Sequence, residues 1–165
     1  MRVPYPWLKK YIDVSLSPER LAEALTMSGT AVERVEKSGG EAVLEIEVTT
    51  NRPDCLSILG VAQEVAALTG KKSRLPKRTH QSPRSKPSSK LTIDVQDRKG
   101  CPKYTGRLLR QVAVGPAPSE AQRFLELVGT RPISNVVDAT NFVLFEIATD
   151  IAAKRVADLL LVEGV

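Results

Sequence analysis

The sequence predicts an α+β protein made of two small modules, with mixed or antiparallel sheets packed by helices and joined by a basic linker. Three observations predict this class. Some short stretches alternate apolar and polar residues, as half-buried strands do, and longer stretches repeat apolar residues at the spacing of a helix. A run rich in proline, serine and basic residues separates them. The expected boundaries are a first module over 1–70, the linker over 71–90 and a second module over 91–165.

The first module should open with a packing anchor followed by a helix. Trp7 and Leu8 are the large apolar residues expected to hold the start of the chain against a core. Ser17 can cap a helix, and Pro18 suits its first position because that position needs no backbone N–H donor. Gly29 is the expected stop, since glycine readily adopts the left-handed conformation that ends helices.

Two strands, a turn and a second helix should follow. Strands are expected around 31–35 and over 43–49, with Gly39-Gly40 as a tight connection between them. The next residues have the composition of a turn and are interpreted as a structural motif, in which Asp54 caps a helix over about 57–69. They are Asn51, Arg52, Pro53 and Asp54. The apolar stripe of that helix is expected at Ile58, Val61, Ala62, Val65 and Leu68, before a stop at Gly70.

The second module is expected to start with a short strand over 91–95 and a longer one over about 103–114. A helix should follow Pro118 and end near Gly129, with Phe124 and its apolar neighbours facing inward. Ser134 can cap the last clear helix.

The linker carries the charge imbalance of the chain. It holds no acid and eight basic residues, so the rest of a chain of net charge +5 is at −3. Such a segment can bind RNA or DNA phosphates without reading sequence, or it can serve as an extended, self-repelling connection. These two roles are compatible. The eight residues are Lys71, Lys72, Arg74, Lys77, Arg78, Arg84, Lys86 and Lys90.

The sequence offers few residues suited to catalysis. There is no glycine-rich phosphate loop, and His80, the one histidine, lies in the linker, which disfavours a histidine-activated nucleophile. Cys55 and Cys101 lack the clustering of a zinc site, so no metal ligand is expected. No apolar run approaches the roughly 20 residues of a membrane span, and we expect a cytoplasmic protein without membrane partners.

Several stretches resemble one known family, in that family's order. MRVPYPWLKKYID and SPERLAEALTMSG open the chain, and TTNRPDCLSILGVAQEVAALTGK covers 49–71. CPKYTGRLLR covers 101–110, and VGPAPSEAQRFLELVGTRPISNVVDATNFVLFE covers 114–146. These stretches resemble the β subunit of bacterial phenylalanyl-tRNA synthetase, the first three its N-terminal B1 module and the last two the opening of its B3/B4 domain.

The resemblance implies a heterotetramer of two α and two β subunits that joins phenylalanine to tRNA with ATP and magnesium. The α subunit would hold the aminoacylation site. The β subunit would contribute structure, tRNA contacts and, in B3/B4, hydrolysis of tRNA mischarged with tyrosine. We therefore expect tRNA(Phe) or another RNA and a synthetase α subunit as partners, a homo-oligomer as an alternative state, and no cofactor bound by this chain itself.

The sequence also departs from the family pattern. Gly39-Gly40 stands where bacterial β subunits carry an OB-fold tRNA-binding insertion, and no counterpart of the later part of B3/B4 or of the C-terminal modules is present. Ala152 falls where the family has its editing-site histidine. We therefore expect no catalytic residue, and whether the chain alone is an enzyme stays open.

The resemblance assigns a functional role of the family to few residues of this chain. Thr140 and Asn141 fall on positions that line the editing pocket of the family, although both can instead satisfy polar groups within a helix. Arg131 is either a phosphate contact or the residue that sets the entry to the last helix. The candidates for RNA phosphates are Lys71, Lys72, Arg74, Lys77, Arg78, Arg84, Lys86 and Arg131.

Three functions follow as hypotheses. The first is a β-subunit-like component of phenylalanine–tRNA ligase, which binds tRNA or assembles with a subunit and has no aminoacylation site of its own. The second is a freestanding editing hydrolase that acts on mischarged tRNA(Phe). The third is a repurposed structural protein that binds RNA.

Overall fold

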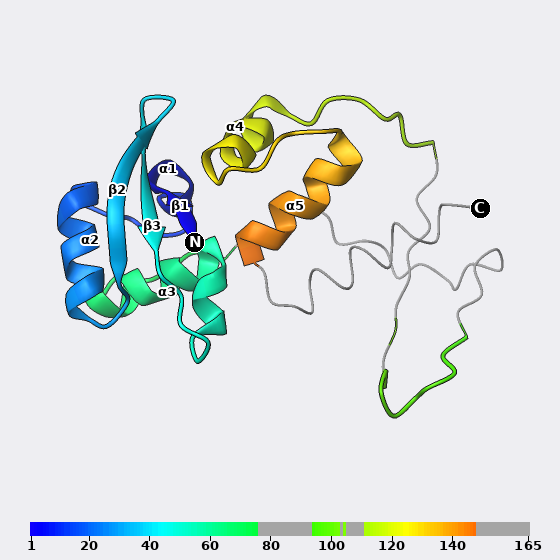
Figure 1. Cartoon of the computed structure of the whole chain (residues 1–165), viewed down its shortest axis with the longest axis horizontal. Helices are drawn as coiled ribbons and strands as arrows, with labels where there is room; N and C mark the ends of the chain where they lie inside the picture. Colours follow the sequence, from blue (N-terminus) through cyan, green and yellow to red (C-terminus); the bar gives the residue numbers. More distant parts are fainter. Residues whose placement is uncertain (76–93, 103, 105–110, 148–165) are drawn as a thin grey trace.

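The computed structural model of the chain describes residues 1–75, 94–102, 104 and 111–147. Within these residues a three-stranded antiparallel sheet of order β1–β3–β2 packs with several helices, as Figure 1 shows. The predicted α+β class is therefore confirmed. None of the helices in the described part of the chain is long and apolar enough to cross a membrane.

The sheet consists of β1 (Arg2–Pro4), β2 (Val32–Ser38) and β3 (Glu41–Ile46), with β3 in the centre. Val43, Leu44 and Ile46 are all buried although successive side chains of a strand point to opposite faces, so both faces of β3 are covered. The predicted connection at Gly39-Gly40 is confirmed. Their φ angles of 58° and 83° are those of a tight hairpin turn that only glycine adopts readily.

The first two helices are α1 (Tyr5–Leu8) and α2 (Pro18–Met27). Trp7 and Leu8 are fully buried, as expected of anchors. The predicted cap of α2 is confirmed, because the Arg20 amide donates to Oγ of Ser17 at 3.3 Å. β1 was not predicted, since a three-residue strand leaves too short a pattern to detect.

The turn after β3 leads through a single 3-10 turn, η1 (Pro53–Leu56), into α3 (Ile58–Thr69). The prediction that Asp54 caps this helix is wrong. Ser57 is the cap, and its Oγ accepts from the Gly60 amide at 3.0 Å, because η1 places Asp54 one turn too early. Gly70 ends α3 in the left-handed conformation, as predicted.

The last two helices are α4 (Ser119–Leu127) and α5 (Asn135–Ile147). Ser134 starts α5 as predicted, with its Oγ accepting from the Val137 amide at 3.4 Å. The strands predicted over 91–95 and 103–114 are not present at 94–95, 104 or 111–114, and the rest of both lies outside the described residues. Around 113–115, the side chain of Asn135 hydrogen-bonds backbone groups that a neighbouring strand would otherwise use. It pairs with the Ala113 carbonyl at 2.9 Å and the Gly115 amide at 3.2 Å.

One core joins the helices of both predicted modules. The Trp7 ring of α1 stacks on Phe124 of α4, with ring centroids 5.0 Å apart, and lies 4.6 Å from Phe142 of α5. The Tyr11 hydroxyl donates to the Glu146 carboxylate near the end of α5. Residues 76–93 lie outside the described part, so the linker role stays a prediction, as does the division into modules.

Candidate functional site

Arg52 makes the densest set of polar contacts in the described residues. It lies just before η1, where the Arg52 amide donates to the Thr49 carbonyl at 2.9 Å and closes the predicted turn. Its Nη2 lies 2.8 Å from Oδ2 of Asp54 and 2.7 Å from Oε2 of Glu64. The same nitrogen lies 3.2 Å from Sγ of Cys55. One guanidinium therefore ties the turn to the middle of α3.

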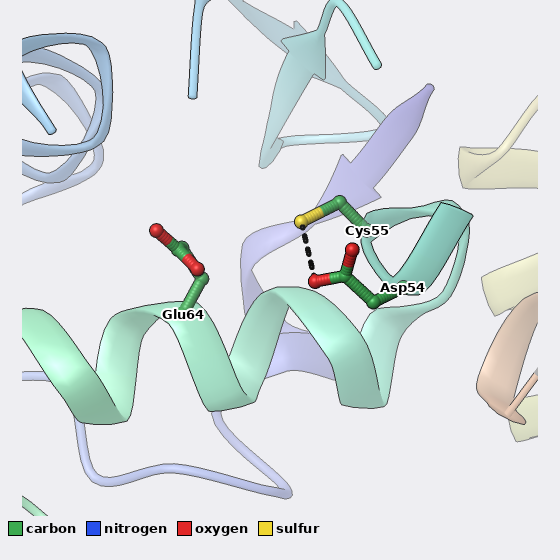
Figure 2. Close-up of side chains that lie close together, drawn as sticks. All are labelled: Asp54, Cys55 and Glu64. Atoms are coloured by element: carbon green, nitrogen blue, oxygen red, sulfur yellow. Dashed lines mark hydrogen bonds between the residues drawn. The ribbon is translucent and has the colours of Figure 1, made fainter. Parts of the chain in front are cut away.

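The three groups around the guanidinium are of the types that bind metal ions. Figure 2 shows Asp54 and Cys55 on η1 and Glu64 on α3, with the thiol hydrogen-bonded to Asp54. One ligand atom from each of Asp54, Cys55 and Glu64 lies within 4.8 Å of the others. The Arg52 guanidinium already supplies the positive charge at their centre, and a metal ion there would meet its repulsion. The geometry fits a structural role, in which Arg52 holds Asp54, Cys55 and Glu64 together and joins η1 to α3. We call these four residues the clamp.

The pKa of the Asp54 carboxyl is lowered in the clamp, whereas the pKa of the Cys55 thiol is raised. The hydrogen bond from Arg52 lowers the pKa of Asp54 to about 2, and the carboxylates in turn raise the pKa of Arg52. Burial raises the pKa of the Cys55 thiol to about 11. A thiol that is protonated at neutral pH and buried is a poor nucleophile, so Cys55 is a packing residue.

A close approach of backbone to backbone supports the clamp. A Cβ built on Gly60 would lie 1.7 Å from the Asp54 carbonyl oxygen, so only glycine lets α3 pass this close to η1. Glu64 and Gly60 were not among the residues predicted for this site. Their spacing of four on one helix face, after a turn that carries Arg52, was the available signal.

The residues predicted to line an editing pocket lie on α5. Thr140 is partly buried, and its hydroxyl donates to the Val137 carbonyl one turn earlier at 2.7 Å. Asn141 is also partly buried. The bond to the Val137 carbonyl agrees with the alternative that Thr140 has a structural role, in which its hydroxyl group hydrogen-bonds to the backbone of its own helix. Ala152 and His80 lie outside the described residues.

The candidates for RNA phosphates divide into two groups. Lys71, Lys72 and Arg74 follow α3 directly, while Arg131 is exposed before α5. The others lie outside the described residues: Lys77, Arg78, Arg84, Lys86 and also Lys90 of the linker. Lys71, Lys72 and Arg74 thus lie on one short segment after α3, and Arg131 lies on a different segment.

Comparisons with known proteins agree with the resemblance in the sequence. Residues 100–154 match the B3/4 domain. Over 146 residues, 88% of this chain, it is 40% identical to a Phenylalanine–tRNA ligase beta subunit of Rhodopirellula baltica, of which it covers 21%. Proteins of the same name from Syntrophus aciditrophicus and Gloeobacter violaceus are 44% and 49% identical over 68% and 64% of this chain, which covers 14% and 13% of them. The chain thus spans about a fifth or less of these relatives.

Proposed function

We propose that the chain acts as a tRNA-binding or subunit-assembly module of a phenylalanine–tRNA ligase, because it is homologous over most of its length to β subunits of that enzyme. The observation that carries the proposal is the similarity over 88% of the chain at 40% identity. It spans both the sheet-containing start of the chain and the region that matches the B3/4 domain. In this proposal the chain works in the cytoplasm, binds tRNA(Phe), and leaves ATP and magnesium to a separate α subunit.

The packing of the structure supports a scaffold role. α4 and α5 belong to the B3/4 match, and they share the aromatic core of α1 through Phe124 and Phe142. The basic residues that follow α3 begin on this packed body, so a phosphate contact there would be held in a fixed orientation. Fixing a binding group in advance lowers the entropy lost on association.

The test uses the purified full chain and fluorescently labelled tRNA(Phe). We expect saturable binding by fluorescence anisotropy that weakens as salt rises, because phosphate contacts release counterions. Co-elution with an α subunit of phenylalanine–tRNA ligase from a sizing column tests the assembly role. If the chain binds neither tRNA nor the α subunit, the proposal fails.

An editing hydrolase is the second candidate, and the B3/4 match together with Thr140 and Asn141 favours it. Incubating the chain with tyrosyl-tRNA(Phe) separates the two functions. The proposed binding role predicts release of tyrosine no faster than in buffer. Faster release that is lost in Asn141→Ala would establish the hydrolase instead. A repurposed RNA-binding protein would bind unrelated RNA as tightly as tRNA(Phe).

A further inference from the structure

Helix α5 is apolar on two opposite sides. Its inner side packs on the core through Phe142 and Phe145, next to the buried Asp138, and the helix lies against α3 and α4 (Figure 1). With about 3.6 residues per turn, a second row of side chains lies opposite these three. We call this row the outer stripe, and it consists of Val136, Thr140, Val143 and Ile147. A helix that is apolar on both sides is normally covered on both.

The outer stripe is exposed at its ends and continues beyond the helix. Ile147 at the last turn is 40% exposed. At the first turn, Ile133 is 71% exposed, and its amide donates to the Asp138 carboxylate at 2.8 Å. Val114, which is 73% exposed, belongs to the segment that the Asn135 side chain binds. The stripe is therefore the middle of a contiguous apolar surface, which is the mark of an interaction site.

The polar groups of α5 do not oppose burial of this surface. The one polar side chain of the stripe is Thr140, and its hydroxyl already donates to the Val137 carbonyl within the helix at 2.7 Å. The two charged side chains of α5 are both engaged elsewhere, Glu146 with the Tyr11 hydroxyl and Asp138 with the Ile133 amide. A partner that covers the stripe would thus leave none of these three groups without a hydrogen bond.

The chemistry of the stripe fits a second copy of the same chain. The chain has a net charge of +5, so two copies repel each other except where the meeting surfaces carry no charge. The other helices expose charges, such as Glu23 of α2 and Glu126 of α4, but the stripe carries none. Its residues are also spaced by four, three and four positions, which is the spacing by which one helix packs along another of the same pattern. A second α5 supplies that pattern.

We propose that the outer stripe of α5 binds the outer stripe of a second copy, with the two helices antiparallel about a two-fold axis. Thr140 then faces Val143 of the second copy, and the symmetry repeats this contact. A helix of 13 residues spans about 20 Å, too short to bury the roughly 800 Å² per partner of a standard interface. We therefore expect a dimer that dissociates in the micromolar range. This inference is independent of the proposed tRNA binding.

The experiment measures the average mass of the full chain by sedimentation equilibrium over about a hundredfold range of micromolar concentrations. Two variants place a charge in the stripe, Val143→Glu and Thr140→Lys. The control is Met27→Glu, which changes an apolar side chain of α2 that is 83% exposed. Far-UV circular dichroism and the emission of Trp7 establish that all variants are folded.

The wild type and Met27→Glu should form dimers alike, and each stripe variant alone should dimerise at least about tenfold more weakly, because its charge would be buried without a partner. An equimolar mixture of the two stripe variants should dimerise again. In the antiparallel pair the introduced ammonium group at position 140 of one copy meets the introduced carboxylate at position 143 of the other. Recovery in the mixture also shows that the single losses do not come from misfolding.

A wild type that stays monomeric over the whole range overturns the proposal, as does a dimer that Val143→Glu leaves intact. Equal losses in Met27→Glu would indicate unspecific association, and losses without recovery in the mixture would contradict the antiparallel contact. If the wild type instead binds an α subunit of phenylalanine–tRNA ligase and Val143→Glu abolishes that complex, the stripe belongs to that subunit and the proposal falls. None of these outcomes bears on the binding of tRNA, which is measured separately.

Discussion

Replacing Phe124 by alanine tests whether the two predicted modules form one cooperative body. Phe124 is 1% exposed on α4, and its ring stacks on Trp7 of α1 with an interplanar angle of 5°. Truncating a buried phenylalanine costs about 3–5 kcal/mol, part of which is an aromatic pair worth about 0.5–1.5 kcal/mol. For a chain of this length, that loss lowers the unfolding midpoint by about 8–15 °C.

The single tryptophan makes the assay direct. Trp7 lies in the first predicted module and Phe124 in the second, so the emission of Trp7 reports on their contact. Thermal unfolding is followed by Trp7 fluorescence and by far-UV circular dichroism, and both midpoints should fall together. Ile133→Ala, at a side chain that is 71% exposed, should leave them within about 1 °C. A Phe124→Ala protein with an unshifted fluorescence midpoint would show that the modules fold independently and that this reasoning is wrong.

Three further changes probe the clamp and the start of α3. Gly60→Ala should destabilise the fold by about 1–3 kcal/mol in urea unfolding, because its Cβ meets the Asp54 carbonyl oxygen, whereas Gly115→Ala, which meets nothing within 4 Å, should be nearly neutral. Ser57→Ala removes the cap of α3 and should cost about 1 kcal/mol by the same assay. The pKa of Asp54 is lowered to about 2 by Arg52, so its charge stabilises the fold above about pH 4 and this contribution is lost as the pH falls toward 2. Asp54→Asn should make the free energy of unfolding depend less on pH in that window. An unchanged pH dependence would contradict the clamp.

Local rules predicted the elements that depend on neighbouring residues. Ser17 and Gly70 mark helix ends through their own hydrogen-bonding and conformational preferences, and Gly39-Gly40 sets a hairpin for the same reason. The capping of α3 was misassigned because Asp54 and Ser57 are both good caps. The 3-10 turn η1 decides between them, because it places Asp54 before the start of α3, where its carboxylate pairs with Arg52 instead.

Contacts between segments far apart in the chain could not be predicted from the sequence. β1 exists because Val3 pairs with Leu44 about forty residues later, and a three-residue strand has no pattern of its own. The partnership of Arg52 with Glu64 and the bond between Arg74 and Tyr11 also depend on how separate elements pack. The family resemblance located the B3/4 region, but it did not reveal that Trp7 packs on Phe124 and Phe142.

Ultraviolet cross-linking of the full chain to tRNA(Phe), followed by mass spectrometry of the peptides, can identify the residues that contact the RNA. Cross-links are expected on the peptides that carry Lys71, Lys72 and Arg74, and added salt should suppress them. Cross-links confined to the surface of α2 and β2, or none above those to a neutral polymer control, would contradict the proposed tRNA binding.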